Sequence, residues 1–249
     1  MAKRVIELLE NSKNCLVFTG AGVSTLSGIR DFRGVGGFYT SDYQGYRVED
    51  LLSLNLFYAN PKLFYDWARE FIYGLESFKP SIVHTTLAKL EKKGIVKGVY
   101  TQNIDLLHQN GGSEKVYEIH GSPANNRCIS CKTSVTYAEI APIVMDGKIP
   151  TCKNCGSVIK PDIIFYGESL NSSLLDKAYS DFAKADLVLA LGSSLTVQPA
   201  ASLPMAAVNN GGVLVIVNAQ ETPLDEFATL LYTDLKELFT EIDSYFTKN

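Results

Sequence analysis

The stretch "FTGAGVSTLSGIRDFRG" (residues 18–34) carries the strongest indication of fold class in this sequence. It continues an apolar run that begins at Cys15, and glycines follow at positions 20 and 22. A strand that turns into a helix over such a glycine pair is typical of Rossmann units, where the turn exposes backbone N–H groups to a pyrophosphate. Thr25 stands where the third glycine of the G-x-G-x-x-G pattern belongs. The stretch therefore predicts a nucleotide-binding turn that differs from the one in dehydrogenases.

Composition and charge restrict the class of protein. The chain has 249 residues, 46% of them hydrophobic and 20% charged, which is enough for one core or for one core with a small appended module. No apolar run approaches the roughly 20 residues of a membrane helix, and residues 1–14 are typical of an amphipathic helix rather than a signal peptide. We therefore expect a cytoplasmic protein without membrane contact. The formal net charge of −4 does not favour nucleic acid as a partner.

Short apolar runs alternate with helical patterns along the chain. Runs that are apolar on both faces are typical of parallel strands buried under helices. Residues 60–76 form a helical pattern in which Asn60 can cap and Pro61 suits the first turn, and Gly94 closes a second pattern. This alternation predicts an α/β fold with a Rossmann-like, doubly wound parallel sheet. The runs interpreted as strands are "CLVFTG", "GVYTQN", "VYEIHG", "DIIFYG", "DLVLALGSS" and "GVLVIVN".

The cysteines predict a metal site. Cys128 and Cys131 form one C-x-x-C pair, Cys152 and Cys155 form another, and twenty residues separate the pairs. This spacing supplies four thiolates to a tetrahedral zinc ion, whereas unrelated buried cysteines or a redox pair are the alternatives. Four sulfur ligands leave no position for water, so we expect structural Zn²⁺. The fifth cysteine, Cys15, lies within a predicted strand and is interpreted as a core residue.

Polar residues follow several of the predicted strands. "TQNID" (residues 101–105) follows one apolar run, "GSS" (residues 192–194) follows another, and Asn218 follows a third. Because the carboxyl ends of parallel strands share one edge of a sheet, these groups should converge on one crevice. The glycine pair alone could be a tight turn without a ligand, but this convergence favours a ligand.

The three histidines differ in their surroundings. His84 and His108 lie on helical patterns, where packed or surface imidazoles are expected. His120 stands at a strand end before a glycine and is the candidate general base, because imidazole accepts a proton near neutral pH. Asp31 and Asp105 would more readily hold hydrogen bonds or charge.

Taken together, these motifs resemble the sirtuin family of NAD-dependent protein deacylases, in particular its compact bacterial and archaeal members. The resemblance implies a Rossmann-like NAD-binding domain formed by residues 1–33, 95–121 and 161–249. It also implies a cofactor loop with a helical insertion at 34–94 and a zinc-binding module at 122–160. The motifs occur in family order across nearly the whole chain: "GAGVSTLSGIRDFRG", "TQNIDLLH", "HG" at 120–121, the paired C-x-x-C, "KPDIIFYGE", "LGSSLTVQPAASLP" and "IVN".

The same resemblance implies roles for individual residues. His120 and Asn103 would be catalytic, and an extended peptide would bond to the backbone of a strand-like segment comprising Ile164, Phe165, Tyr166, Gly167 and Glu168. NAD, as a co-substrate, would contact Gly20, Ala21, Gly22, Thr25, Asp31, Phe32, Arg33, Gln102, Asn103, Ile104, Asp105, Gly192, Ser193, Ser194, Asn218 and Asp234.

The reaction that the resemblance implies is substitution at the ribose carbon that bears nicotinamide. The carbonyl oxygen of an acyl-lysine attacks this carbon, nicotinamide leaves, and an alkylamidate forms. His120 then takes a proton from the ribose hydroxyls so that one of them attacks the amidate. Water completes the transfer of the acyl group to ADP-ribose, so the products are nicotinamide, O-acyl-ADP-ribose and deacylated lysine. Because an amide oxygen is a poor nucleophile, positioning and exclusion of water must supply much of the acceleration.

Two positions depart from patterns of the family. Arg30 replaces the proline that is usual in SGIPDFRG, which loosens the backbone and adds a charge beside the cofactor loop. Ala68 lies three residues after Tyr65, where sirtuins specialised for acidic acyl groups carry arginine. Without that guanidinium a buried carboxylate would lack an ion pair, so we expect preference for acetyl and other neutral acyl groups over succinyl.

Two other functions remain as alternatives. A mono-ADP-ribosyltransferase would use the same NAD pocket and pass ADP-ribose to a protein side chain. A non-catalytic module would bind nucleic acid or a partner through its zinc ribbon, with the NAD pocket as a sensor. His120 and the segment "KPDIIFYGE" favour deacylation of acetyl-lysine proteins or peptides. We expect a monomer that does not bind nucleic acid directly.

Overall fold

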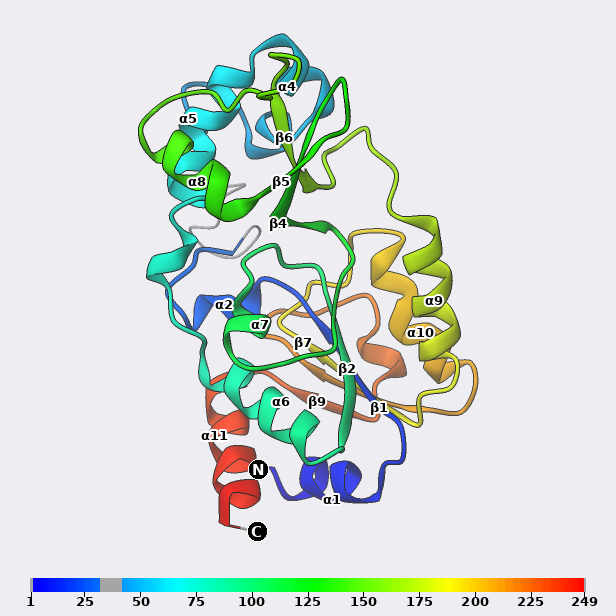
Figure 1. Cartoon of the computed structure of the whole chain (residues 1–249). Coiled ribbons are helices and arrows are strands. Elements are labelled where there is room, and N and C mark those ends of the chain that lie inside the picture. The colour runs from blue at the N-terminus through cyan, green and yellow to red at the C-terminus, as the bar shows by residue number, and fades with distance from the viewer. Residues whose placement is uncertain (1, 32–41, 249) are drawn as a thin grey trace.

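The structure is a computed structural model that describes residues 2–31 and 42–248. In this part of the chain, parallel strands form a six-stranded sheet in the order β3-β2-β1-β7-β8-β9 (Figure 1). Numbered within this sheet alone, the order is 3-2-1-4-5-6, the doubly wound order of the Rossmann fold. The predicted fold class is therefore confirmed. The strands are β1 (Cys15–Thr19), β2 (Val96–Thr101), β3 (Val116–Glu118), β7 (Leu187–Leu191), β8 (Val213–Val217) and β9 (Leu230–Tyr232).

Helices cover both faces of this sheet (Figure 1). Side chains of a strand alternate between the two faces, so a strand that is covered on both sides must be apolar at nearly every position. β1 shows this directly, since Val17 packs into the cluster on one face and Phe18 into the cluster on the other. Cys15 is fully buried in the first cluster, as predicted. The first face carries α1 (Lys3–Asn11), α6 (Ile82–Lys92) and α11 (Leu235–Lys248), and the second carries α9 (Ser172–Phe182) and α10 (Leu203–Val208).

The helix ends follow the local signals in the sequence. The side chain of Asn60 accepts a hydrogen bond of 3.1 Å from the backbone N–H of Leu63 and caps α5 (Pro61–Phe71). Such a cap stabilises a helix by about 1 kcal/mol. Gly94 follows α6 with a φ of +73°, which only glycine adopts without cost. Both predicted helices are thus confirmed.

A smaller sheet occupies the other end of the molecule (Figure 1). Its order is β5-β4-β6, and both pairs of neighbouring strands are antiparallel. The interpretation of "DIIFYG" as one of the parallel strands is therefore wrong, because that run overlaps β6. β6 is buried only at alternate positions, and so short a run does not distinguish the two kinds of sheet. The strands are β4 (Gly121–Cys128), β5 (Ser134–Thr136) and β6 (Ile159–Ile163).

The small sheet shares one hydrophobic cluster with a helical segment that precedes it in the chain. Phe64 and Trp67 of α5 pack in the same cluster as Ile140, Cys128 and Cys152. By contrast, α6 packs in the cluster of the large sheet. The predicted division of the chain into domains stays a prediction. We call the small sheet together with the helices of its cluster the small unit. These helices are α3 (Val48–Leu51), α4 (Leu54–Ala59), α5 and α8 (Tyr137–Met145).

Short turns of helix connect the larger elements. α2 (Gly22–Thr25) follows β1 directly, and α7 (Leu107–Asn110) lies between β2 and β3. Within the described ranges, no helix combines the length and the apolar character that a membrane span requires. The remaining short elements are η2 (Leu75–Ser77), η3 (Ala200–Ser202) and η4 (Asp225–Phe227).

Candidate active site

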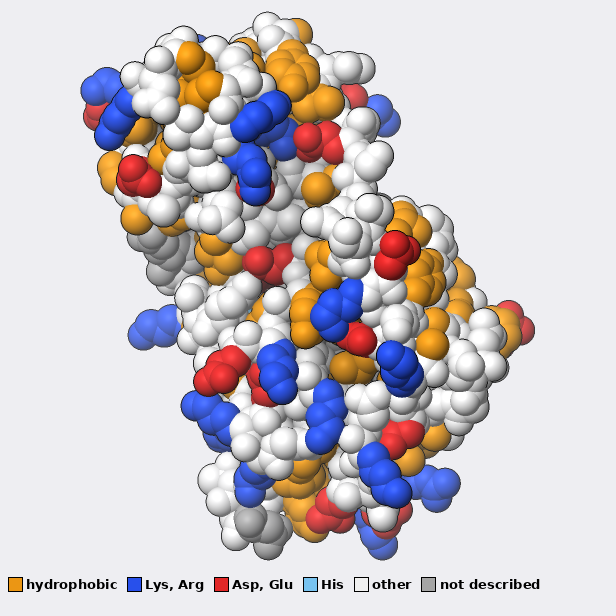
Figure 2. Space-filling model, turned by 45° about the vertical axis from the view of Figure 1, so that its right-hand side comes forward, with side chains coloured by type: hydrophobic (Ala, Val, Ile, Leu, Met, Phe, Trp, Pro, Cys, Tyr) orange, Lys and Arg blue, Asp and Glu red, His pale blue; other side chains and the backbone are white. Residues whose placement is uncertain are grey.

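A cavity of about 1100 Å³ lies where the carboxyl ends of the parallel strands meet the small sheet. Figure 2 shows the narrow waist between the lobe of the small sheet and the lobe of the large sheet. Segments that are far apart in the sequence converge here, as expected for the open edge of a doubly wound sheet. Of the predicted site residues, the cavity is lined by Gly20, Ala21, Gly22, Thr25, Asp31, Gln102, Asn103, Ile104, His120, Ile164, Phe165, Tyr166, Gly167, Glu168, Gly192, Ser193, Ser194, Asn218 and Asp234.

Of the described residues that were predicted to contact NAD, Asp105 alone does not line this cavity. Asp105 lines a smaller cavity next to it, and the two cavities share Ala21, Asn103 and Ile104. Phe32 and Arg33 lie outside the described residues.

The glycine turn after β1 is packed against the tip of β7. The backbone N–H of Gly22 donates to the carbonyl oxygen of Gly192 over 2.8 Å. A Cβ atom at Gly22 would lie 2.7 Å from Cα of Gly192, and one at Gly192 would lie 2.6 Å from the backbone nitrogen of Val23. Gly192 also has a φ of +57°. Glycine is thus required on both loops, and the motifs "GAG" and "GSS" depend on each other across the point where the strand order reverses.

Hydrogen bonds hold Asn103 and Asp105 beside this turn. Nδ2 of Asn103 donates to the carbonyl oxygen of Gly20 (3.0 Å) and to Oγ of Ser24 (3.2 Å). Oγ of Ser24 donates to Oδ2 of Asp105 over 2.5 Å, and Oδ1 of Asp105 accepts from the backbone N–H of Leu107 over 2.9 Å. Burial raises the pKa of Asp105, and these hydrogen bonds oppose that change. Because the protein holds the NH₂ group of Asn103, its Oδ1 is the atom that can accept a bond from a ligand.

His120 is half-buried at the wall of the cavity. Its Nδ1 lies 3.1 Å from the carbonyl oxygen of Gln102. A carbonyl oxygen only accepts hydrogen bonds, so Nδ1 carries the proton and Nε2 is the basic nitrogen. The next residue, Gly121, has a φ of +76°, and a Cβ atom there would lie 2.0 Å from the carbonyl oxygen of Asp162. The "HG" motif therefore combines an imidazole whose basic nitrogen is Nε2 with a following position at which only glycine fits.

Gln102 has hydrogen-bonding capacity that the protein does not use. Its Oε1 accepts from Oγ of Ser193 over 2.9 Å, which joins the tips of β2 and β7. Its Nε2 is buried, and no described residue bonds to it. Buried amide groups are rarely left unpaired, so this nitrogen fits a polar ligand atom in the cavity.

The predicted peptide-binding segment already uses part of its backbone within the protein. The N–H of Ile164 donates to the carbonyl oxygen of His120 over 2.8 Å. Tyr166 donates to the carbonyl oxygen of Leu52 (2.8 Å) and accepts from Leu54 (3.0 Å). The backbone N–H of Phe165 donates to Oε2 of Glu168, and its carbonyl oxygen accepts from the backbone N–H of Glu168. Among the described residues, the C=O of Ile164 and both backbone groups of Gly167 have no partner.

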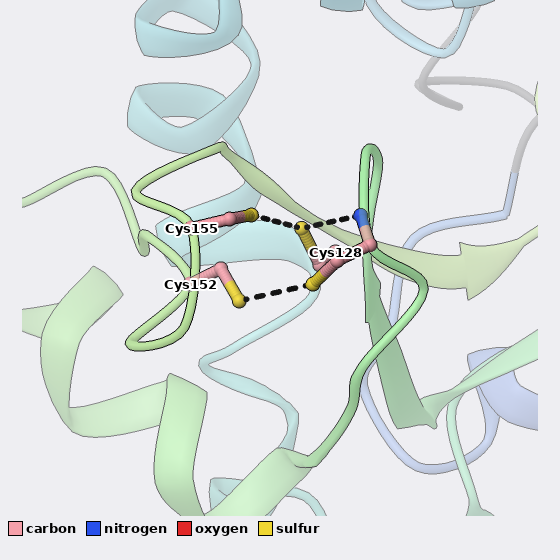
Figure 3. Close-up of side chains that lie close together, drawn as sticks. Cys128, Cys152 and Cys155 are labelled. Carbon is pink, nitrogen blue, oxygen red and sulfur yellow. Dashed lines mark hydrogen bonds between the residues drawn. The ribbon is translucent and has the colours of Figure 1, made fainter.

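The four cysteines of the C-x-x-C pairs form one cluster (Figure 3). Their sulfur atoms all lie within 4.8 Å of one another. Sγ of Cys128 is 3.4 Å from that of Cys155, and Sγ of Cys131 is 3.5 Å from that of Cys152. A tetrahedral zinc ion with Zn–S bonds of about 2.3 Å places its sulfur ligands roughly 3.8 Å apart. The cluster therefore fits Zn²⁺ with all four positions filled by protein.

The two positions that depart from family patterns lie in different surroundings. Tyr65 and Ala68 are buried in the cluster of the small unit, where the Tyr65 hydroxyl donates to the carbonyl oxygen of Ile159. Neither lines the large cavity. Arg30 lines the smaller cavity, and its Cζ lies 5.4 Å from the ring centroid of Phe71.

Comparison with known proteins agrees with this geometry. The model of the Sir2 family matches residues 20–199. An NAD-dependent protein deacetylase of Thermotoga maritima is 43% identical over 230 residues, which cover 92% of each chain. One of Sulfolobus acidocaldarius is 41% identical and covers 96% of this chain and 92% of its own. A solved structure of Sir2 with a p53 peptide and NAD+ is 40% identical, covers 100% of both chains and has a TM-score of 0.89. This chain therefore belongs to the Sir2 family, the sirtuins.

Proposed function

We propose that this protein is an NAD-dependent protein-lysine deacetylase, which releases nicotinamide, O-acyl-ADP-ribose and deacylated lysine. The observation that carries the proposal is that His120, the glycine turn and the segment 164–168 line one cavity. The similar chains named above support it, because two are named deacetylases and the third holds NAD+ together with a peptide.

NAD would lie along the carboxyl edge of the large sheet. The backbone at Gly20 and Gly192 would meet the pyrophosphate, and Asn218 and Asp234 would meet the adenosine end. The unpaired Nε2 of Gln102 would bond to the ribose nearest His120. When bound, NAD supplies the electrophilic ribose carbon and the nicotinamide leaving group.

The residues of this chain would orient the reactants and move one proton. Nε2 of His120 would accept a proton from a ribose hydroxyl, since Nδ1 is held by the carbonyl oxygen of Gln102. Oδ1 of Asn103 would accept a hydrogen bond at the same end of the cavity. An extended peptide would bond to the C=O of Ile164 and to the backbone of Gly167, the groups left without internal partners in the described chain.

Zn²⁺ would be held by Cys128, Cys131, Cys152 and Cys155, and it would serve structure rather than chemistry. The ion would tie the turn after β4 to the turn before β6, within the cluster that packs on α5. Since a site with four protein ligands offers no place for water, every step of the reaction is assigned to the large cavity.

The natural substrates would be acetyl-lysine proteins, acted on by a monomer in the cytoplasm, where reduced thiolates persist. On the face drawn in Figure 2, basic and acidic side chains are interspersed, which does not favour a nucleic-acid partner.

The test is to incubate the purified protein with NAD and an acetyl-lysine peptide. We expect nicotinamide, deacetylated peptide and O-acetyl-ADP-ribose in equal amounts. Replacing His120 with alanine should lower the rate by at least about 100-fold, the usual contribution of a general base. ADP-ribose attached to protein, with the peptide still acetylated, would instead identify a mono-ADP-ribosyltransferase. Binding of NAD without any product would identify a non-catalytic module.

A further inference from the structure

Lys160 is a largely buried cation at the base of the proposed peptide-binding segment. Its side chain is only 12% exposed, and Nζ lies 2.8 Å from Oε2 of Glu168. Nζ also donates to the carbonyl oxygens of Pro161 (3.1 Å) and Ile163 (2.8 Å). A lysine ammonium has three N–H donors, so these three acceptors use all of them. The ammonium further lies 3.9 Å from the ring centroid of Phe165.

Glu168 completes a closed set of contacts within the same segment. The Oε2 atom that receives Lys160 also accepts the backbone N–H of Phe165 over 2.8 Å. The backbone N–H of Glu168 donates back to the carbonyl oxygen of Phe165 over 2.9 Å. The Lys160–Glu168 ion pair therefore joins β6, which contains Lys160, to the far end of the loop formed by residues 164–168.

This arrangement determines which backbone groups face a ligand. The ammonium of Lys160 donates to the carbonyl oxygens of Pro161 and Ile163, and the carboxylate of Glu168 accepts from the N–H of Phe165. The C=O of Ile164 lies between these groups in the chain and is not used by the ion pair. Ile164 and Gly167 line the large cavity, whereas Lys160 does not. Lys160 can thus influence a bound peptide only through the shape of the loop.

We propose that Lys160 is a positioning residue for the acyl-lysine peptide. Paired with Glu168, its ammonium holds Ile164 and Gly167 in the geometry to which an extended peptide bonds. This inference rests on the proposed function. Breaking a buried pair leaves an uncompensated charge and unpaired carbonyls, so the loop would relax and its bonds to the peptide would weaken. NAD would lie against other loops and would be bound as before.

The test separates the KM for peptide from the KM for NAD. We expect Lys160→Met to raise the peptide KM by about tenfold, which corresponds to the loss of about one hydrogen bond between the loop and the peptide. The KM for NAD should change less than about twofold. Lys160→Arg keeps a buried cation and should bring the peptide KM back to within about threefold of wild type. Glu168→Gln should act like Lys160→Met, and the double variant should be no worse than either single one.

Arg127→Gln is the matched control. It breaks a 2.8 Å ion pair with Asp162 on the same small sheet, but the Arg127 side chain is 58% exposed, and its ion pair is with Asp162 rather than with a residue of the segment 163–168. Its peptide KM should equal that of wild type. Equal changes in both KM values for Lys160→Met, or a peptide KM that stays at the wild-type value, would overturn the inference. If Lys160→Met does not fold, Glu168→Gln decides the same question. A wild-type protein that releases no nicotinamide would instead refute the proposed function.

Discussion

Two buried imidazoles should make the free energy of unfolding fall steeply between pH 7 and pH 5.5. His84 and His108 are 0% and 1% exposed, and their ring centroids lie 4.6 Å apart. Burial lowers the pKa of His84 to about 4. Burial also lowers the pKa of His108 well below its ordinary value, and the neighbouring His84 adds to this. His84 is therefore neutral in the folded protein throughout this pH range, and burial favours the neutral form of His108 as well.

The sign follows from proton uptake. Both folded-state pKa values lie below the ordinary value of about 6.5, so the unfolded chain binds more protons as the pH falls. The penalty is absent well above pH 6.5 and accumulates down to the folded-state pKa of about 4 for His84. At pH 5.5 His84 costs about 1.4 kcal/mol, against roughly 0.2 kcal/mol at pH 7. His84 alone should therefore remove about 1.2 kcal/mol from a typical stability of 5–15 kcal/mol, and His108 should add a loss of the same sign.

The assay is urea unfolding at pH 7.0 and 5.5 for wild type and two variants. His84→Asn keeps an acceptor near the position of Nδ1, which receives the backbone N–H of Ser81 over 3.1 Å. His108→Gln keeps a polar atom near the position of Nε2, which lies 2.9 Å from Oγ1 of Thr19. On acidification His84→Asn should lose about 1.2 kcal/mol less than wild type, and His108→Gln should also lose less than wild type. Contributions from the zinc thiolates and from carboxylates are common to all three proteins and cancel in this difference.

Parallel loss of stability in all three proteins would refute the reasoning. Nitrogen NMR of the three histidines offers an independent check. Because Nδ1 of His84 accepts a backbone N–H, its proton should be on Nε2, whereas the proton of His120 should be on Nδ1. A charged His84 at pH 5.5 would contradict its lowered pKa, and the opposite tautomer of either ring would contradict the hydrogen bond that its Nδ1 makes.

Further outcomes follow from the packing of the site. Gly192→Ala would bring a Cβ atom to 2.6 Å from the backbone nitrogen of Val23, so the loops after β1 and β7 should separate. We expect the unfolding free energy to fall by about 1–3 kcal/mol and the KM for NAD to rise. A variant with wild-type values would contradict this account. Cys131→Ser should lose zinc by elemental analysis and expose the small unit to proteolysis, with retained protection as the contrary result. Acetyl-peptides should show a higher kcat/KM than succinyl-peptides, and Ala68→Arg should destabilise the protein rather than confer desuccinylation, because residue 68 is fully buried. Faster desuccinylation by either protein would refute that prediction.

Much of the architecture could be predicted from the sequence, because its signals are local. Runs that are apolar on both faces identify β1 and β7, because a strand covered by helices on both sides buries nearly all of its side chains. The cap at Asn60 and the glycine at 94 mark helix ends through bonds within a few residues. The spacing of the two C-x-x-C pairs likewise predicts a metal-binding cluster without reference to the rest of the sequence.

Other features depend on contacts between distant segments, which no local pattern encodes. Only the folded chain decides that β6 pairs antiparallel with β4, and that Tyr65 and Ala68 are buried away from the large cavity. The same holds for the tautomer of His120, which depends on a carbonyl eighteen residues away. In the sequence Lys160 cannot be distinguished from an exposed lysine. Its burial and its three hydrogen-bond acceptors, on which the proposed positioning role rests, are visible only in the folded chain. The periodicity and spacing of residues thus determine which helices, strands and cysteine clusters form. The pairing of strands, the hydrogen-bond partners of side chains and the position of the proton on His120 depend on which elements meet in the folded chain.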